Sequence, residues 1–144
     1  MRIIVDADAC PVKNIIDIEA KKRNIPVIMV SNINHNITSD YAEVIWVDET
    51  AEAADFAIIN MLQPEDLVVT QDYGLASLVL GKKAQAISPL GMVYDLNNID
   101  SLLMQRHINA KARKAGIKTS NPKKRKGIDD EKFKNNFNKL IDKK

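Results

Sequence analysis

The sequence of 144 residues has one cysteine, Cys10, and few aromatic residues, which make up 5% of the chain. One cysteine excludes an internal disulfide and a cysteine-rich zinc site. No apolar run reaches the ~20 residues of a membrane span, so we expect no membrane partner. A Gly-rich phosphate loop is also missing, which argues against nucleotide hydrolases and dehydrogenases. Strand-like residues begin at Arg2, which leaves no room for a signal peptide and predicts a cytoplasmic protein.

Charge is distributed unevenly along the chain, although the net charge is only +2. Residues 1–104 contain 7 Lys/Arg and 15 Asp/Glu, whereas residues 105–144 contain 14 Lys/Arg and 4 Asp/Glu. A basic end is typical of polyanion binding, although lysine-rich ends also favour solubility. Contacts with a phosphate backbone would be independent of sequence and weakened by salt. The side chains of the basic segment that we expect to make them are Lys123, Lys124, Arg125 and Lys126.

Short apolar runs rich in β-branched residues predict buried strands in the first two thirds of the chain. The runs span residues 3–5, 27–30, 44–47 and 67–69, and a weaker run spans residues 84–87. Helical patterns alternate with them, over residues 12–20, 50–62, 73–80 and 97–115. Continuous apolar strands suit a sheet that is covered on both faces. The sequence therefore predicts an α/β protein, a three-layer α/β/α sandwich with a mostly parallel central sheet.

The length of the chain is near the commonest size of one domain. We expect this domain over residues 1–117, followed by a basic linker and a short C-terminal helix over residues 118–144. The linker prediction rests on residues 118–128, which are polar, basic and interrupted by Pro122 and Gly127. Residues 129–140 have a helical pattern with an apolar face.

Several carboxylates follow the predicted strands, where an open α/β sheet binds its ligands. Asp6 ends the first strand, Asp8 lies two residues later, and Asp72 follows the fourth strand. Asp55 lies among apolar residues of a predicted helix, where an acid needs a partner or a metal. Glu52 shares its helix face, although the helix N-terminus also favours an acid there without any ligand. The pattern predicts one acidic site built from distant segments.

Acids held together repel one another, and a divalent cation relieves this repulsion. Mg²⁺ prefers oxygen ligands and binds substrate phosphate while keeping several waters. Two such ions roughly 4 Å apart can activate a water and stabilise the leaving oxygen in phosphodiester cleavage. The sequence therefore predicts a nuclease or phosphodiesterase that uses Mg²⁺ or Mn²⁺. The residues expected to carry catalysis are Asp6, Asp8, Asp55 and Asp72, and those expected to bind metal are Asp6, Asp55, Asp72 and Glu52.

Two other functions fit the same residues. A nucleic-acid-binding protein could have the acids and the basic end without turnover. The order Asp6-Ala7-Asp8 also opens the haloacid-dehalogenase phosphatases, in which the first Asp is the nucleophile and the second the general acid. The chain lacks the later acidic pair of those enzymes and has no room for their cap. His35 and His107 have no spacing for a zinc site and are predicted to be surface residues.

Four stretches resemble the YaiI/YqxD family of bacterial proteins: VDADACP at 5–11, EAAD at 52–55, VTQDYGLA at 69–76 and SPLG at 88–91. That family is similar to the PIN-like domains, whose better-known members are metal-dependent nucleases. The resemblance implies a PIN-like fold, with Asp6, Asp55 and Asp72 as its acids. It also implies phosphate contacts by Arg106 and Arg113.

Thr70, inside the third of these stretches, is a further candidate for a substrate contact through its hydroxyl. Capping and turn roles explain this residue equally well. With the basic segment, these features make nucleic acid the expected partner, and single-stranded RNA the preferred one. The sequence leaves open whether two copies form a homodimer.

Overall fold

A computed structural model describes residues 1–50, 52–118 and 124–143 of the chain. Its centre is a sheet of five parallel strands in the order β3-β2-β1-β4-β5. The strands are β1 (Ile3–Asp6), β2 (Val27–Asn32), β3 (Glu43–Val47), β4 (Leu67–Val69) and β5 (Gln85–Ile87). The chain winds toward one edge from β1 to β3 and then crosses to the other side of β1. The order of the strands therefore reverses between β1 and β4, which is where such sheets open a crevice at their carboxyl edge.

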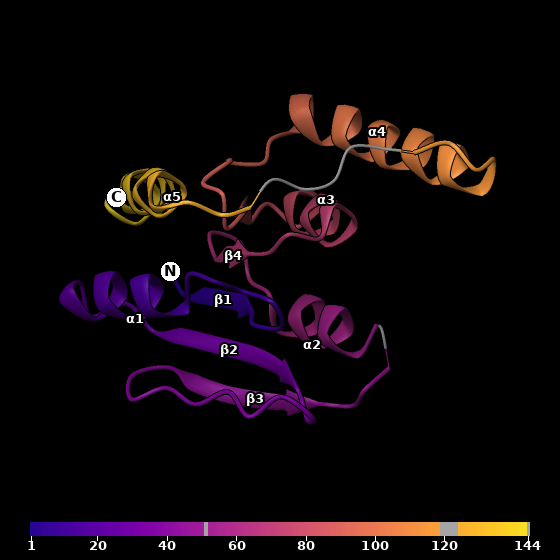
Figure 1. Cartoon of the computed structure of the whole chain (residues 1–144). Coiled ribbons are helices and arrows are strands. Elements are labelled where there is room, and N and C mark those ends of the chain that lie inside the picture. The colour runs from indigo at the N-terminus through magenta and orange to yellow at the C-terminus, as the bar shows by residue number, and fades with distance from the viewer. Residues whose placement is uncertain (51, 119–123, 144) are drawn as a thin grey trace.

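Helices cover both faces of the sheet, which confirms the predicted three-layer α/β/α sandwich (Figure 1). On one face lie α1 (Lys13–Lys22) and α5 (Gly127–Ile141), which pack against Ile3, Val5 and Leu67. On the other face lie α2 (Ala53–Met61), α3 (Tyr73–Gly81) and α4 (Leu96–Lys114), which pack against alternate strand residues. Within the described residues, no helix is both long and apolar enough to cross a bilayer.

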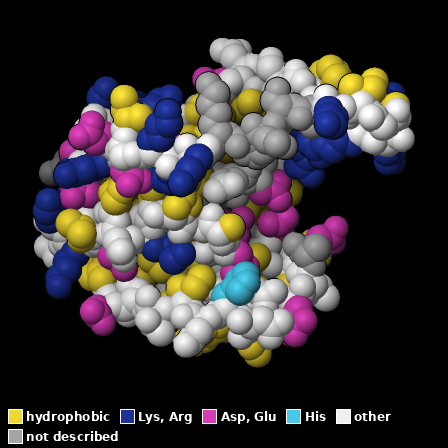
Figure 2. Space-filling view, in the orientation of Figure 1, with side chains coloured by type: hydrophobic (Ala, Val, Ile, Leu, Met, Phe, Trp, Pro, Cys, Tyr) yellow, Lys and Arg dark blue, Asp and Glu magenta, His cyan; other side chains and the backbone are white. Residues whose placement is uncertain are grey.

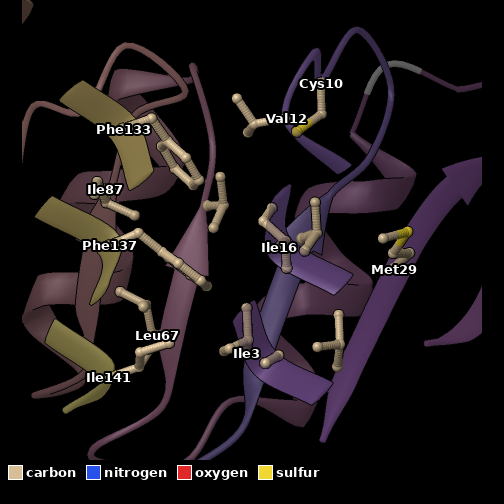
Figure 3. Packing of buried hydrophobic residues seen from close by; sticks show 14 of the residues in the cluster. Ile3, Cys10, Val12, Ile16, Met29, Leu67, Ile87, Phe133, Phe137 and Ile141 are labelled. Atoms are coloured by element: carbon tan, nitrogen blue, oxygen red, sulfur yellow. The ribbon is translucent and has the colours of Figure 1, made fainter. Parts of the chain in front are cut away.

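The C-terminal helix α5 completes the core of the domain. Phe133 and Phe137 are both 0% exposed, and their rings stack with centroids 5.1 Å apart. They lie over Leu67 of β4 and Ile87 of β5, as Figure 3 shows. The helix expected over residues 129–140 is therefore present, and Phe133, Phe137, Leu140 and Ile141 bury its apolar face in the core. The segment expected to follow the domain thus contributes side chains to the core of that domain.

The helix expected from Thr50 begins three residues later, at Ala53. The backbone carbonyl of Thr50 accepts a hydrogen bond from the Ala53 amide, so Thr50 belongs to the turn before the helix and not to its cap. By contrast, Asp95 caps α4 through a capping box with Asn98. Only Ile99 of α4 is buried, and the second half of this helix extends beyond the sheet (Figure 1).

Candidate functional site

The site lies where β1 and β4 end side by side in parallel register. Asp6 is the last residue of β1, and Thr70 follows β4 directly. The Thr70 hydroxyl donates to Oδ2 of Asp6 at 3.0 Å and accepts from the Asp72 amide at 3.0 Å. Thr70 is only 1% exposed. Its hydroxyl therefore positions the two acids, and the expected substrate contact of Thr70 stays a prediction.

Asp72 is also the cap of α3. Its Oδ1 accepts hydrogen bonds from the amides of Gly74 at 2.8 Å and Leu75 at 3.2 Å. The guanidinium of Arg106, from α4, lies 3.5 Å from the same oxygen. The second oxygen, Oδ2, has no hydrogen-bond donor among the described residues. One half of the carboxylate thus fixes its orientation, and the other half is available to a ligand.

Four acids from three segments interact electrostatically at this edge. Burial raises the pKa of Asp6 from 3.8 to about 6; the Thr70 hydrogen bond opposes this, and repulsion by Asp55, Asp8 and Asp72 adds to it. Burial likewise raises the pKa of Asp55, with repulsion from Asp72 and Glu52 as further causes. The fold therefore places these carboxylates near enough to repel one another, and their predicted roles stay predictions. Glu52 is exposed and lies at the start of α2, beside this group.

Asp8 connects this edge to the loop after β2. Its carboxylate accepts hydrogen bonds from the Ser31 hydroxyl, the Asn32 amide and Nδ1 of His35. Burial alone would raise the pKa of Asp8, but these hydrogen bonds outweigh burial and lower it. Asp8 is therefore ionised at neutral pH and holds no proton to donate as the general acid of the phosphatase alternative. His35 is exposed, as predicted for a surface residue, and it also contacts Asp8.

The fit of a divalent cation depends on how closely the carboxylates approach one another. Within the described part of the chain, no three or more Asp, Glu, His or Cys side chains lie close enough to bind one ion together. A preassembled cage is thus absent there. Mg²⁺ commonly binds through only one or two carboxylates, with waters and substrate phosphate completing its shell. Oδ1 of Asp6, Oδ2 of Asp72 and the carboxylate of Asp55 are oxygen donors that suit this mode.

Basic side chains of α4 face the acidic residues. Figure 2 shows acidic side chains gathered beneath α4, in a hollow of the molecular surface, with Lys and Arg side chains on the helix above them. Arg106 reaches from α4 to Asp72, as the expected phosphate contact requires. Arg113 lies in the last turn of α4, together with Lys111 and Lys114. The hollow therefore has an acidic floor and a basic upper edge.

The basic segment before α5 divides into structural and exposed side chains. Arg125 donates to Asp130 and to the Pro89 carbonyl, and its side chain is 22% exposed. This residue therefore anchors the start of α5, and its expected phosphate contact stays a prediction. Lys124 and Lys126 are exposed. Lys123 lies outside the described residues.

Comparisons with known proteins agree with the motifs of the sequence. The chain matches the family described as "Uncharacterized BCR, YaiI/YqxD family" over residues 4–143. A UPF0178 protein of Clostridium novyi is 54% identical over 99% of this chain and 96% of its own length. A UPF0178 protein of Clostridium tetani is 48% identical over 99% of this chain and 98% of its own length.

Among solved structures, a mutant of Rae1 (YacP) from Bacillus subtilis is similar, with a TM-score of 0.46 and 20% identity. The similarity covers 93% of this chain and 91% of that one. The family match, together with relatives near 50% identity along almost the whole length, confirms the resemblance carried by the VDADACP motif. This chain belongs to the YaiI/YqxD family.

Proposed function

We propose that this protein is a metal-dependent nuclease or related phosphodiesterase that cleaves RNA or DNA with Mg²⁺ or Mn²⁺. The observation that carries the proposal is the convergence of Asp6, Asp55 and Asp72 at the carboxyl edge of the sheet, where they repel one another. The resemblance of the family to PIN-like nucleases supports it. The substrate of this proposal is a nucleic acid because the acidic floor faces the basic helix α4.

Different residues of the site would position the acids and bind the substrate in such a reaction. Thr70 orients Asp6 and fixes the Asp72 backbone, so that the free oxygen of each carboxylate keeps its position. A bound Mg²⁺ or Mn²⁺ would supply an activated water and neutralise charge on the leaving oxygen. Arg106 is placed to hold a substrate phosphate beside Asp72. Asp8 ties the β1 loop to the β2 loop and so fixes the floor of the hollow.

The test is cleavage of labelled single-stranded RNA in Mn²⁺ or Mg²⁺ by the wild-type chain and by Asp6→Asn and Asp72→Asn. Asparagine at position 6 can still accept from Thr70, and asparagine at position 72 is as good a helix cap as aspartate. The matched control is Asp40→Asn, an exposed acid just before β3 at the opposite end of the strands. We expect the wild type and the control to cleave the RNA. We expect no cleavage by either site variant, and none in EDTA.

Other results would point to other functions. A second candidate, a nucleic-acid-binding protein without turnover, is favoured by the lack of a close group of three metal-binding side chains among the described residues. It predicts salt-sensitive binding by all variants and cleavage by none. A beryllofluoride adduct on Asp6 would instead indicate an aspartyl-phosphate phosphatase. Undiminished cleavage by Asp6→Asn and Asp72→Asn would contradict the proposal.

A further inference from the structure

An exposed tryptophan lies at the edge of the sheet, beside the loop after β2 that carries His35. Trp46 is the one tryptophan of the sequence, and it is 51% exposed in the edge strand β3. With residues 33–36 it lines an open hollow of about 430 Å³, which is not the hollow beneath α4. Exposure of so large an apolar ring forgoes the favourable free energy of burying it. An exposed indole at a hollow is therefore a candidate contact surface.

The hollow is joined to the acidic edge by a chain of contacts. His35 lines the hollow, and its Nδ1 hydrogen-bonds the carboxylate of Asp8. Asp8 in turn interacts electrostatically with Asp6 at the end of β1. The other ring nitrogen of His35, Nε2, has no partner among the described residues, and the side chain is 55% exposed. A ligand in the hollow would thus contact His35, the residue that hydrogen-bonds Asp8.

The lining of the hollow combines three kinds of group. Trp46 and Ile33 offer flat and apolar surface, and both are more than half exposed. Asn34 and Asn36 offer side-chain amides that make no hydrogen bond with the rest of the described chain. An amide donates and accepts, as the edge of a nucleobase does. Aromatic stacking with hydrogen bonds to the base edge is how proteins bind unpaired bases.

We propose that this hollow binds a base of a single-stranded nucleic acid, stacked on Trp46, with the amides of Asn34 and Asn36 available to the polar edge of the base. The proposal rests on the proposed function and narrows its substrate to single strands, because the bases of a duplex are stacked on one another. The other occupant to consider is a second copy of this chain, since the outer edge of β3 has no partner strand among the described residues. Such an interface would bury the amides and the imidazole without matched partners, which costs free energy.

Trp46 reports on its own surroundings, because its fluorescence is the only indole signal of the chain. The whole chain is titrated in EDTA, where no cleavage is expected, with a single-stranded oligouridylate and with an abasic oligomer of equal length and charge. We expect the uridylate to quench the fluorescence and to bind more tightly than the abasic oligomer. Variants at position 46 lack this signal, so the affinities of the wild type and of all variants are compared by the fluorescence anisotropy of labelled oligomers. Trp46→Ala should weaken uridylate binding on the order of 5- to 150-fold, the effect of losing one stacked base.

Two control variants separate stacking from a general effect on the fold. Trp46→Phe keeps an aromatic surface and should retain most of the affinity. Leu78→Ala removes an apolar side chain that is 58% exposed on α3, outside the hollow, and should leave binding unchanged. Binding of the abasic oligomer should be the same for all of these variants.

Equal affinity for the two oligomers, no binding of either, or an unchanged affinity after Trp46→Ala would overturn the proposal. So would light scattering that shows a dimer for the wild type and a monomer for Trp46→Ala, which would assign the surface to a second copy. The cleavage assay is independent of this titration. Quenching without cleavage in Mn²⁺ would contradict the nuclease function and support the base-binding site. Cleavage without quenching would support the nuclease function and contradict the base-binding site.

Discussion

Replacing Asp6 with asparagine should stabilise the metal-free protein at neutral pH. The pKa of Asp6 in the folded protein is about 6, above its ordinary value of 3.8, because the carboxyl is buried and faces other acids. Asparagine has nearly the same shape, carries no charge and can still accept the hydrogen bond of Thr70. The variant therefore resembles the protonated form of Asp6 at every pH.

The sign and size of the effect follow from the two pKa values. The folded state binds the proton more tightly than the unfolded state, so the free energy of unfolding falls as the pH rises from about 4 to about 6. The interval between 3.8 and about 6 corresponds to about 3 kcal/mol, at 1.36 kcal/mol per pKa unit. Asp6→Asn should therefore be more stable than the wild type by at most about 3 kcal/mol at pH 8, and equal to it below pH 4.

Urea unfolding in EDTA between pH 4 and pH 8 measures this difference, with Asp40→Asn as the control that removes only the repulsion of Asp17 and should show a much smaller change. In Mg²⁺ the order should reverse, because only the wild type gains the binding free energy, about 4.1 kcal/mol at a thousandfold excess over Kd. A variant that is less stable than the wild type at pH 8, or a difference that does not change with pH, would refute the reasoning.

Three further predictions concern the surroundings of the site. Thr70→Val should lower the free energy of unfolding by about 1–3 kcal/mol, because it removes the hydroxyl that donates to Asp6 and leaves the Asp72 amide without its acceptor; urea unfolding measures this. Truncation after Gly116 should unfold the chain, because it removes four buried side chains of α5 worth roughly 6–12 kcal/mol; loss of the cooperative thermal transition is the readout. Replacing Lys124 and Lys126 together with alanine should weaken nucleic-acid binding and reduce its salt dependence, and an unchanged salt slope in a filter-binding assay would return these exposed lysines to a solubility role.

The truncation prediction shows where local sequence patterns stop being informative. The apolar face of residues 129–140 indicated a helix, and Gly127–Ile141 is helical. The pattern did not indicate which surface the helix covers, because periodicity records which residues are buried and not what buries them. The same limit applies to Arg125, which reads as part of a basic run and in the fold pairs with Asp130.

Some residues of the site could be placed from the sequence and others could not. Asp6 and Asp72 could be placed from the sequence, because a residue that follows a parallel strand lies at the carboxyl edge of the sheet wherever that strand stands. The contact of His35 with Asp8 joins residues that are 27 apart, and nothing in the local pattern of either one indicates it. Metal binding stays a prediction, supported by the repulsion among the acids.

The sequence by itself determined the kind of elements, their alternation and the ends at which the acids lie, because each depends on residues close together along the chain. The order of the strands was decided by tertiary structure, since it depends on which faces of distant segments pack together. That order puts β1 beside β4, so that Asp6, Thr70 and Asp72 share one hydrogen-bonded group. It also puts Trp46 on an outer edge, where the ring remains exposed instead of entering the core.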